Sequence, residues 1–245
     1  MRQEVHRWYS HRIGRDMPIK VYGHFGFPLL MFPTAAADFE EYERFLLLDA
    51  IEHLIDAGRV KVFSIDSMNR QTWMNKDVGP GHRAYLHEFY DQYVTEEVVP
   101  FIWSKQGMRQ GIITTGASVG GYHAANFLLR HPDKFTGTIA MSGAHDLSQF
   151  IDDYMDPLVY RNSPYAYVPN LGGERLRLLQ DHGKRIHIVS GQGAYESPGM
   201  SGHLSKLLWD KGIWHNLDLW GHDMRHDWPT WRKMLPYYLE SRTFE

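Results

Sequence analysis

The sequence predicts an α/β fold in which helices cover both faces of a mostly parallel sheet. Short apolar, β-branched runs alternate with segments of helical spacing along most of the chain. This alternation is typical of parallel sheets, because each helix returns the chain to the start of the next strand. The 245 residues are 43% apolar, enough for a sizeable core, and contain no repeat or linker. We therefore expect one domain over residues 1–245.

The first expected element is an antiparallel hairpin. Residue types alternate over residues 4–22 around Gly14-Arg15-Asp16, as in two strands joined by a turn. Later strands are inferred from apolar runs, and helices from apolar residues three and four apart. The expected strands cover residues 28–32, 60–65, 111–115, 135–141, 185–190 and 214–220, and the expected helices cover 39–58, 83–103, 119–131, 174–182, 199–212 and 229–239.

Glycines and prolines mark the ends of several expected helices. Gly58 fits a helix C-cap, and Pro229 fits the first turn of the last helix. Pro100 is expected to kink or shorten the end of its helix. Residues 147–173 are rich in tyrosine and proline and predict short helices and loops that form a small cap-like region.

Composition excludes several function classes. The net charge of −3 comes from interspersed charges without a basic stripe, so no nucleic-acid partner is expected. Cysteine is absent, which excludes disulfides, a thiolate nucleophile and Cys-ligated zinc. The charged N-terminal stretch lacks the apolar centre of a signal peptide, and no apolar run is long enough to span a membrane. A cytoplasmic protein without membrane contact is the expectation.

The stretch that organises the chain is Gly116-Ala-Ser118-Val-Gly120, a G-x-S-x-G match between an expected strand and an expected helix. A serine on such a sharp turn is held in a strained conformation with its hydroxyl exposed above the sheet. The flanking glycines are required because a Cβ there would collide with neighbouring elements. The N–H of Val119, at the helix start, can donate to an oxyanion. Ser118 is therefore the candidate nucleophile.

A serine nucleophile needs a base and a third group that orients the base. In this arrangement the acid and the histidine follow the serine in the chain. His222 and His226, between the last strand and the last helix, are equally placed as the base. Glu196, the only carboxylate in the loop after residues 185–190, is the favoured acid. Asp146, after the preceding strand, is the alternative.

A second oxyanion donor is expected in the loop after an early strand. Residues 34–37 fit, because their small side chains let a backbone N–H approach a substrate. Ala35 and Ala36 are the two candidates, and the sequence does not decide between them.

These motifs resemble the esterase family of α/β-hydrolases, which includes esterase D (S-formylglutathione hydrolase), feruloyl-esterase-like and mycolyltransferase-like members. The resemblance implies the α/β-hydrolase fold and extends from the first hairpin to the last helix. It favours His226 over His222, because the family's H-x-W-x-x-W motif begins with the catalytic histidine, and it is consistent with Glu196. The resemblance is carried by residues 32–42 (FPTAAADFEEY), 116–121 (GASVGG), 191–196 (GQGAYE) and 226–231 (HDWPTW).

The chain departs from these relatives at two places. They often have methionine where this chain has Val119, which matters little if only the N–H is used. They often have serine or glycine where this chain has three alanines at 35–37, which leaves the second oxyanion donor open.

The resemblance implies hydrolysis of carboxylic esters or thioesters through an acyl-enzyme intermediate. Ser118 attacks, His226 takes the proton and Glu196 orients the imidazole. No cofactor and no metal are expected, and the expected partner is a small-molecule acyl ester or thioester. The oligomeric state stays open, with a homodimer among the alternatives. Four aromatic residues are candidates for the substrate pocket, and core packing is equally expected for each: Trp73, Tyr165, Tyr195 and Trp228.

Two rival functions remain at this point. The i, i+4 pair His222 and His226 resembles half of a zinc hydrolase motif, but Gly221 and Pro229 place it outside a helix. The other rival is a non-catalytic binding protein with the same fold, since fold alone does not give activity.

Overall fold

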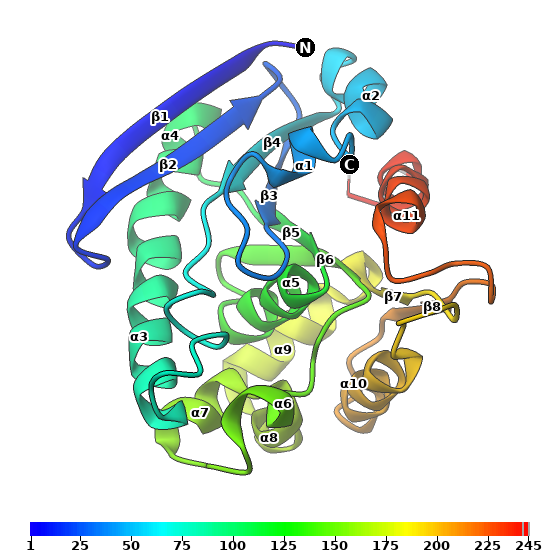
Figure 1. Ribbon diagram of the computed structural model, residues 1–245. Coiled ribbons are helices and arrows are strands. Elements are labelled where there is room, and N and C mark those ends of the chain that lie inside the picture. The colour runs from blue at the N-terminus through cyan, green and yellow to red at the C-terminus, as the bar shows by residue number, and fades with distance from the viewer. Residues whose placement is uncertain (242, 245) are drawn as a thin grey trace.

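The computed structural model describes residues 1–241 and 243–244 and is built on an eight-stranded sheet (Figure 1). The strand order is β1-β2-β4-β3-β5-β6-β7-β8. β1 pairs with β2 and β2 with β4 in antiparallel fashion, and all later pairs are parallel. The strands are β1 (Gln3–Ser10), β2 (Arg15–Tyr22), β3 (Phe27–Phe32), β4 (Val60–Ile65), β5 (Ile112–Ala117), β6 (Phe135–Met141), β7 (Ile186–Ser190) and β8 (Asn216–Leu219).

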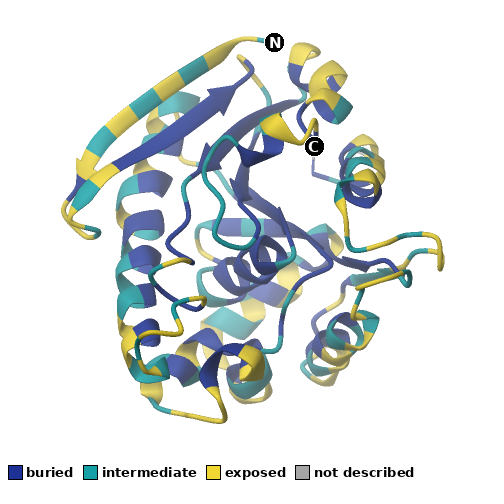
Figure 2. Cartoon of the chain, viewed as in Figure 1, coloured by how far each residue is buried: buried dark blue, intermediate teal, exposed yellow. Residues whose placement is uncertain are grey.

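This arrangement confirms the expected fold class. The N-terminal hairpin turns at Gly14, whose φ of +76° suits glycine. β1 is one of the two edge strands and alternates between exposed and half-buried residues before it ends at the buried Ser10. The central strands β3, β4 and β5 are buried apart from the half-buried Phe27 at the start of β3 (Figure 2). Strands covered on both faces are expected to be apolar without alternation, as these are.

Two of the three hydrophobic core clusters cover the sheet, one on each face. On one face, residues such as Phe32 and Phe63 pack against α3, α4, α5, α9 and α10. On the other, residues such as Met31 and Val62 pack against α1, α2 and α11. The helices are α1 (Glu41–Arg44), α2 (Glu52–Asp56), α3 (Pro80–Tyr93), α4 (Val99–Gln106), α5 (Val119–Arg130), α6 (Ser148–Ile151), α7 (Pro157–Asn162), α8 (Pro164–Tyr167), α9 (Gly173–Asp181), α10 (Pro198–Asp210) and α11 (Trp228–Glu240), with 3₁₀ turns at Asp49–Ile51, Val168–Asn170 and Gly183–Arg185.

The helix expected over residues 39–58 is wrong as a single element. It is interrupted after α1, where Leu46 has a φ of +58°. The N–H groups of Leu47 and Leu48 both return to the carbonyl oxygen of Tyr42. The interruption leaves Phe45 and Leu46 exposed and turns Leu47 and Leu48 into the core. The chain ends this region at Gly58 with a φ of +67°, as expected of a C-cap.

The helix expected over residues 83–103 runs through α3 and α4, which lie end to end along one side of the molecule (Figure 1). Its irregularity is a π-helical turn, η2 (Val94–Val98), which precedes Pro100. Pro100 closely follows this turn, near the start of α4, so the irregularity that a proline causes in a continuous helix falls at the π-helical turn. The proline therefore neither shortens nor ends the helix, which continues to Gln106.

The region 147–173 consists of α6, α7, α8 and a 3₁₀ turn, as its composition predicts. α7 packs against α3, and α8 packs against α10. Asp156 caps α7 by accepting from the N–H groups of Leu158 and Val159.

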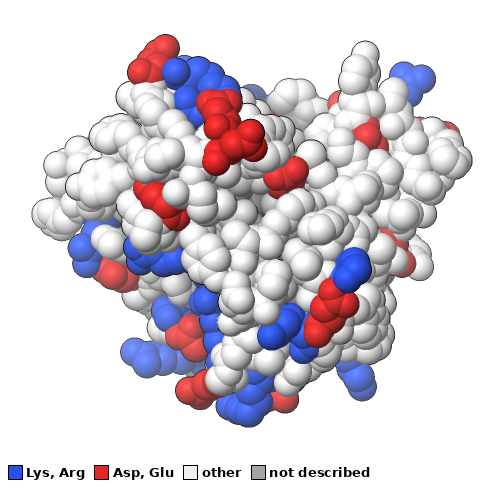
Figure 3. Space-filling view, turned by 90° about the horizontal axis from the view of Figure 1, so that it is seen from below, with Lys and Arg blue, Asp and Glu red and all other residues white. Residues whose placement is uncertain are grey.

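The surface carries mixed charge. On the face seen in Figure 3, acidic and basic side chains adjoin each other in several places and most of the surface is uncharged. Across residues 1–241 and 243–244, no helix combines the length and apolar character that crossing a bilayer requires.

Candidate active site

Ser118 lies at a sharp turn between β5 and α5. Its φ of 57° and ψ of −123° are strained for a residue with a side chain. The turn is held by its backbone, because Ser118 N–H donates to the carbonyl oxygen of Met141 at 3.0 Å. The Ser118 carbonyl oxygen accepts from the N–H groups of Tyr122 and Ala144. Ser118 itself is half-buried, so the backbone is fixed while the side chain stays accessible.

The turn requires glycines because neighbouring backbone passes directly over it. A Cβ at Gly116 would lie 2.4 Å from the carbonyl carbon of Gly120. A Cβ at Gly120 would lie 2.2 Å from the carbonyl oxygen of Phe32 and 2.8 Å from that of Pro33. These overlaps bear out the steric reason inferred from the sequence, and they place the end of β3 against the first turn of α5.

Gly120→Ala is therefore expected to lower the free energy of unfolding by about 1–3 kcal/mol, since the added methyl group must displace backbone. Thermal denaturation followed by circular dichroism measures the effect. Gly202→Ala, in α10, is the matched control, because a Cβ there has no neighbour within 4 Å among the described residues. A helical Gly→Ala change in open space should stabilise by up to about 1 kcal/mol. Equal melting temperatures for the two variants would contradict this account of the turn.

Glu196 and His226 form a hydrogen-bonded pair. His226 Nδ1 lies 3.3 Å from Glu196 Oε2, and the side chains are 25% and 1% exposed. Burial alone would raise the pKa of Glu196, but hydrogen bonds from His226, Ser142 and the Gly191 backbone outweigh it and lower that pKa. The carboxylate is thus ionised and oriented toward the imidazole. Because Nδ1 faces Glu196, Nε2 is the nitrogen left to exchange protons with another group.

Two serine hydroxyl groups form hydrogen bonds with the carboxylate of Glu196. Ser142 Oγ donates to Glu196 Oε1 at 2.6 Å, and Ser190 Oγ donates to Oε2 at 3.3 Å. Ser142 Oγ also accepts from Trp231 Nε1 at 3.1 Å. Neither serine was a candidate from the sequence, where each marks only the end of an expected strand.

These contacts join the candidate acid and base to the strands beside Ser118. Ser142 follows Met141, whose carbonyl oxygen accepts from Ser118 N–H. The groups therefore stand at the carboxyl ends of the adjacent strands β5, β6 and β7, where open α/β sheets place their ligands. Within residues 1–241 and 243–244, Ser118 and His226 share no direct hydrogen bond. Such contacts are often long without substrate and tighten in its presence.

The loop after β3 turns at residues 34–37. Ala35 has a φ of +35°, and Ala37 N–H donates to the carbonyl oxygen of Thr34 at 3.0 Å. Thr34 is anchored by the carboxylate of Glu41, which accepts from both its N–H and its Oγ1. Val119 provides the first N–H of α5, which has no partner within the helix.

The alternative residues are placed differently. Asp146 accepts from the N–H of Ser148 at 2.9 Å and so caps its own loop. His222 is exposed in the turn between β8 and α11. His222 and His226 lie outside any helix, whereas the zinc motif needs both on one helical face. In the described part of the chain, no group of three or more His, Asp or Glu side chains is arranged to hold a metal ion.

The four candidate pocket residues are buried to very different degrees. Trp73 is fully buried in a cluster with Val119 and Tyr122, so contact with a substrate would require its neighbours to move. Tyr165 is half-buried and donates to the carbonyl oxygen of Met200. Tyr195 is 90% exposed, next to Glu196. Trp228 stacks on Phe45 with ring centroids 4.4 Å apart.

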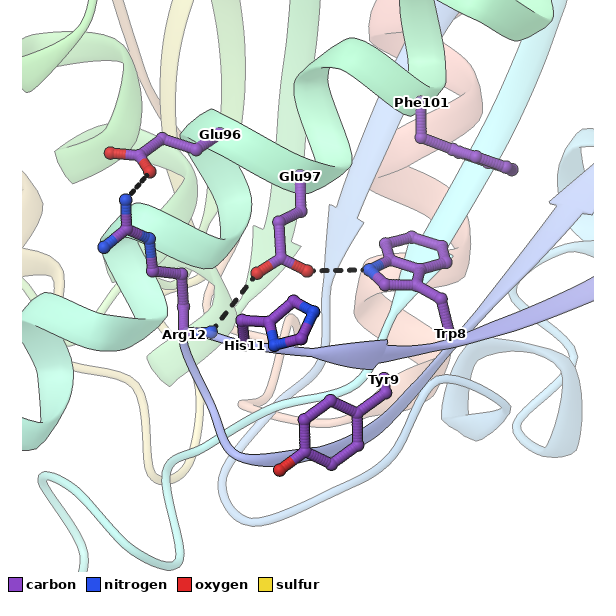
Figure 4. Close-up of a pocket in the computed structure, with 7 residues that line it drawn as sticks. All are labelled: Trp8, Tyr9, His11, Arg12, Glu96, Glu97 and Phe101. Carbon is purple, nitrogen blue, oxygen red and sulfur yellow. Dashed lines mark hydrogen bonds and ion pairs between the residues drawn. The ribbon is translucent and has the colours of Figure 1, made fainter.

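A cavity of about 590 Å³ lies elsewhere, between the N-terminal hairpin and η2 (Figure 4). Both glutamates that line this cavity already have polar partners. Glu97 accepts from Trp8 Nε1 at 2.7 Å, and Glu96 forms an ion pair with Arg12. None of the sequence-derived site residues lines this cavity, whose polar groups join the edge hairpin to the helix behind it.

A family model described as "Putative esterase" matches residues 10–243. The chain belongs to this Esterase family. The match covers nearly the whole chain and confirms both the resemblance and the identification of an esterase. No curated protein sequence matches the chain.

Several solved structures share the fold of this chain. A ferulic acid esterase shares 17% identity with this esterase at a TM-score of 0.71, covering 99% of this chain and 98% of that one. An S-formylglutathione hydrolase from Staphylococcus aureus shares 15% identity at a TM-score of 0.66, covering 99% and 96%. A fluorophosphonate-binding serine hydrolase of Staphylococcus aureus shares 16% identity at a TM-score of 0.63, covering 100% and 99%. These likenesses show a shared α/β-hydrolase fold.

Proposed function

We propose that this esterase hydrolyses small carboxylic esters or thioesters through a triad of Ser118, His226 and Glu196. The observation that carries the proposal is the strained serine turn on β5 beside a buried, ionised Glu196 that is hydrogen-bonded to His226. A serine hydroxyl is a weak nucleophile at neutral pH and needs such a base and orienting acid.

In the proposed mechanism, Ser118 Oγ attacks the carbonyl carbon while His226 Nε2 takes the hydroxyl proton. The imidazolium then gives that proton to the leaving alcohol or thiol, and an acyl-enzyme ester remains on Ser118. His226 next takes a proton from the water that attacks the acyl-enzyme carbonyl carbon. The imidazolium returns this proton to Ser118 Oγ as the bond from Oγ to the acyl carbon breaks and the acid leaves. Glu196 stabilises the imidazolium and fixes the histidine tautomer.

The negative charge on the tetrahedral intermediate would be held by backbone N–H groups. Val119 supplies one at the start of α5, where the helix dipole favours negative charge. The loop at Ala35 and Ala36 supplies the other. Each such donor contributes about 3 kcal/mol of transition-state stabilisation.

The experiment that tests this function is a substrate panel. Short p-nitrophenyl esters, an aryl-acid ester and an acyl thioester are given to the wild-type protein and to Ser118→Ala. The names of the ferulic acid esterase and the S-formylglutathione hydrolase motivate the last two substrates. Hydrolysis that needs Ser118 supports the proposal, and rates that are the same in both proteins contradict it.

Glu196→Gln is expected to lower kcat by about 10⁴-fold, because an amide cannot stabilise the imidazolium or hold the productive tautomer. The shape of the side chain is kept, so the serines that contact it remain packed. Steady-state kinetics on p-nitrophenyl acetate measure the effect.

Asp146→Asn is the control for that substitution, since it also neutralises a half-buried carboxylate after a strand of the sheet. It should leave kcat within about threefold of wild type. A large loss in Asp146→Asn with little loss in Glu196→Gln would transfer the acid to Asp146.

A further inference from the structure

The loop at residues 34–37 is a strained turn. Ala35 is the only central residue of this turn with a positive φ, the pattern of a type II′ turn, which usually has glycine there. A side chain in this conformation costs free energy, so contacts from the rest of the protein must hold the turn in place.

Side chains outside the loop hold four of its polar groups. Glu41 holds Thr34, and Ser67 Oγ donates to the carbonyl oxygen of Ala37 at 2.7 Å. Asn69 Nδ2 donates to the carbonyl oxygen of Ala35. In the described part of the chain, the N–H groups of Ala35 and Ala36 donate to no protein acceptor.

Asn69 fixes the direction of one of these two N–H groups. The C=O and N–H of a trans peptide point in opposite directions, and no described peptide is cis. Asn69 is 1% exposed, so its side-chain amide contacts the Ala35 carbonyl oxygen from the interior of the protein. The N–H of Ala36 therefore points away from the interior. The end of β3 lies against the first turn of α5, so the loop that follows β3 begins beside the turn that carries Ser118.

His123 in turn fixes Asn69. The Ala35 carbonyl oxygen can only accept, so the amide nitrogen of Asn69 must face it and Oδ1 must face His123. His123 Nε2 lies 2.7 Å from that Oδ1 and must carry the proton. Burial lowers the pKa of His123 to about 3, so the ring stays neutral. His123 stacks on His87 with centroids 5.3 Å apart, and Tyr90 meets it edge-on.

We propose that Asn69 and His123 are positioning residues that aim the N–H of Ala36 at the oxyanion, which makes Ala36 the second donor. The proposal rests on the proposed function. His123 lies in α5 little more than one turn after Ser118, so one helix would carry the nucleophile, the first oxyanion donor and the support of the second.

Asn69→Asp tests the proposal because it keeps the size of the side chain and its acceptor toward His123, while the ionised carboxylate lacks the donor to Ala35 and adds a negative charge. We expect kcat on p-nitrophenyl acetate to fall about 10- to 100-fold, since a donor misplaced by about 1 Å loses most of its effect. KM should stay within about twofold. Burst titration counts the competent sites, so that kcat is expressed per active molecule.

Thr72→Val is the matched control. Thr72 is fully buried in the same segment, and its Oγ1 donates to the carbonyl oxygen of Met68 at 2.9 Å, away from the oxyanion loop. The Thr72→Val protein should be less stable than the wild-type protein. Its kcat per active site should stay within about twofold of the wild-type value. A kcat in Asn69→Asp that matches Thr72→Val would overturn the proposal.

Two variants of His123 keep the proposal testable if Asn69→Asp does not fold. His123→Gln can place an amide N–H near the position of Nε2 and should stay within about threefold of wild-type kcat, whereas His123→Leu should lose about tenfold or more. Equal kcat values in the two variants would contradict a positioning role. Failure of the proposed function is distinct, since the wild-type protein would then show no Ser118-dependent hydrolysis.

Discussion

Ser118→Ala is expected to reduce kcat for p-nitrophenyl acetate by about 10⁶-fold, the cost of removing the nucleophile from a serine triad. The fold should be unaffected, because the contacts of Ser118 that hold the turn are made by its backbone. The positive φ of this position also costs a similar conformational free energy for alanine as for serine. Kinetics and thermal melting measured on the same preparation separate the two effects.

Ser201→Ala is the control for this loss. Ser201 is buried in α10, and its hydroxyl makes no hydrogen bond among the described residues. Its removal should leave kcat unchanged. If Ser118→Ala keeps its rate within about tenfold of wild type, the nucleophile lies elsewhere and the site must be assigned again.

His226→Ala is expected to cost about 10⁵- to 10⁶-fold in kcat, because without the imidazole the serine proton has no acceptor. His226 is the histidine whose ring contacts the buried Glu196. Its backbone N–H donates to the carbonyl oxygen of Ala194. Assays over a range of pH measure the loss, since hydroxide can partly replace the base at high pH.

His222→Ala is the matched control four residues away. His222 is exposed and should be replaceable with less than about a tenfold change in kcat. The reverse result would make His222 the base. A chelator that abolished wild-type activity, with recovery on adding zinc, would favour the metal hydrolase considered from the sequence.

The sheet was predictable because its strands are signalled locally. Apolar runs such as residues 60–65 leave little alternative to a buried strand, and the observed β4 has those bounds. The helix over residues 39–58 failed for the opposite reason. Its spacing is helical, but the chain breaks at Leu46 to bring Leu47 and Leu48 into the core. Local periodicity does not reveal that these two leucines are buried, because their burial depends on which elements cover this face of the sheet.

The site divides in the same way. Ser118 was predictable because the glycines around it are a local requirement of the turn. Ser142 and Asn69 were not, because their partners are far away in the sequence. Ser142 meets Glu196 across 54 residues, and Asn69 meets Ala35 across 34. No short motif records such contacts, and serine and asparagine are common at strand ends and in loops.

The most direct measurement of the central claim is covalent labelling with a fluorophosphonate, followed by tryptic mapping in a mass spectrometer. Cleavage after Arg109 and Arg130 yields a peptide of residues 110–130 in which Ser118 is the only serine. If Ser118 is the nucleophile and His226 its base, one adduct per chain forms on this peptide, and labelling is slowed in His226→Ala. An intact protein that remains unlabelled, or an adduct on any other peptide, would contradict it.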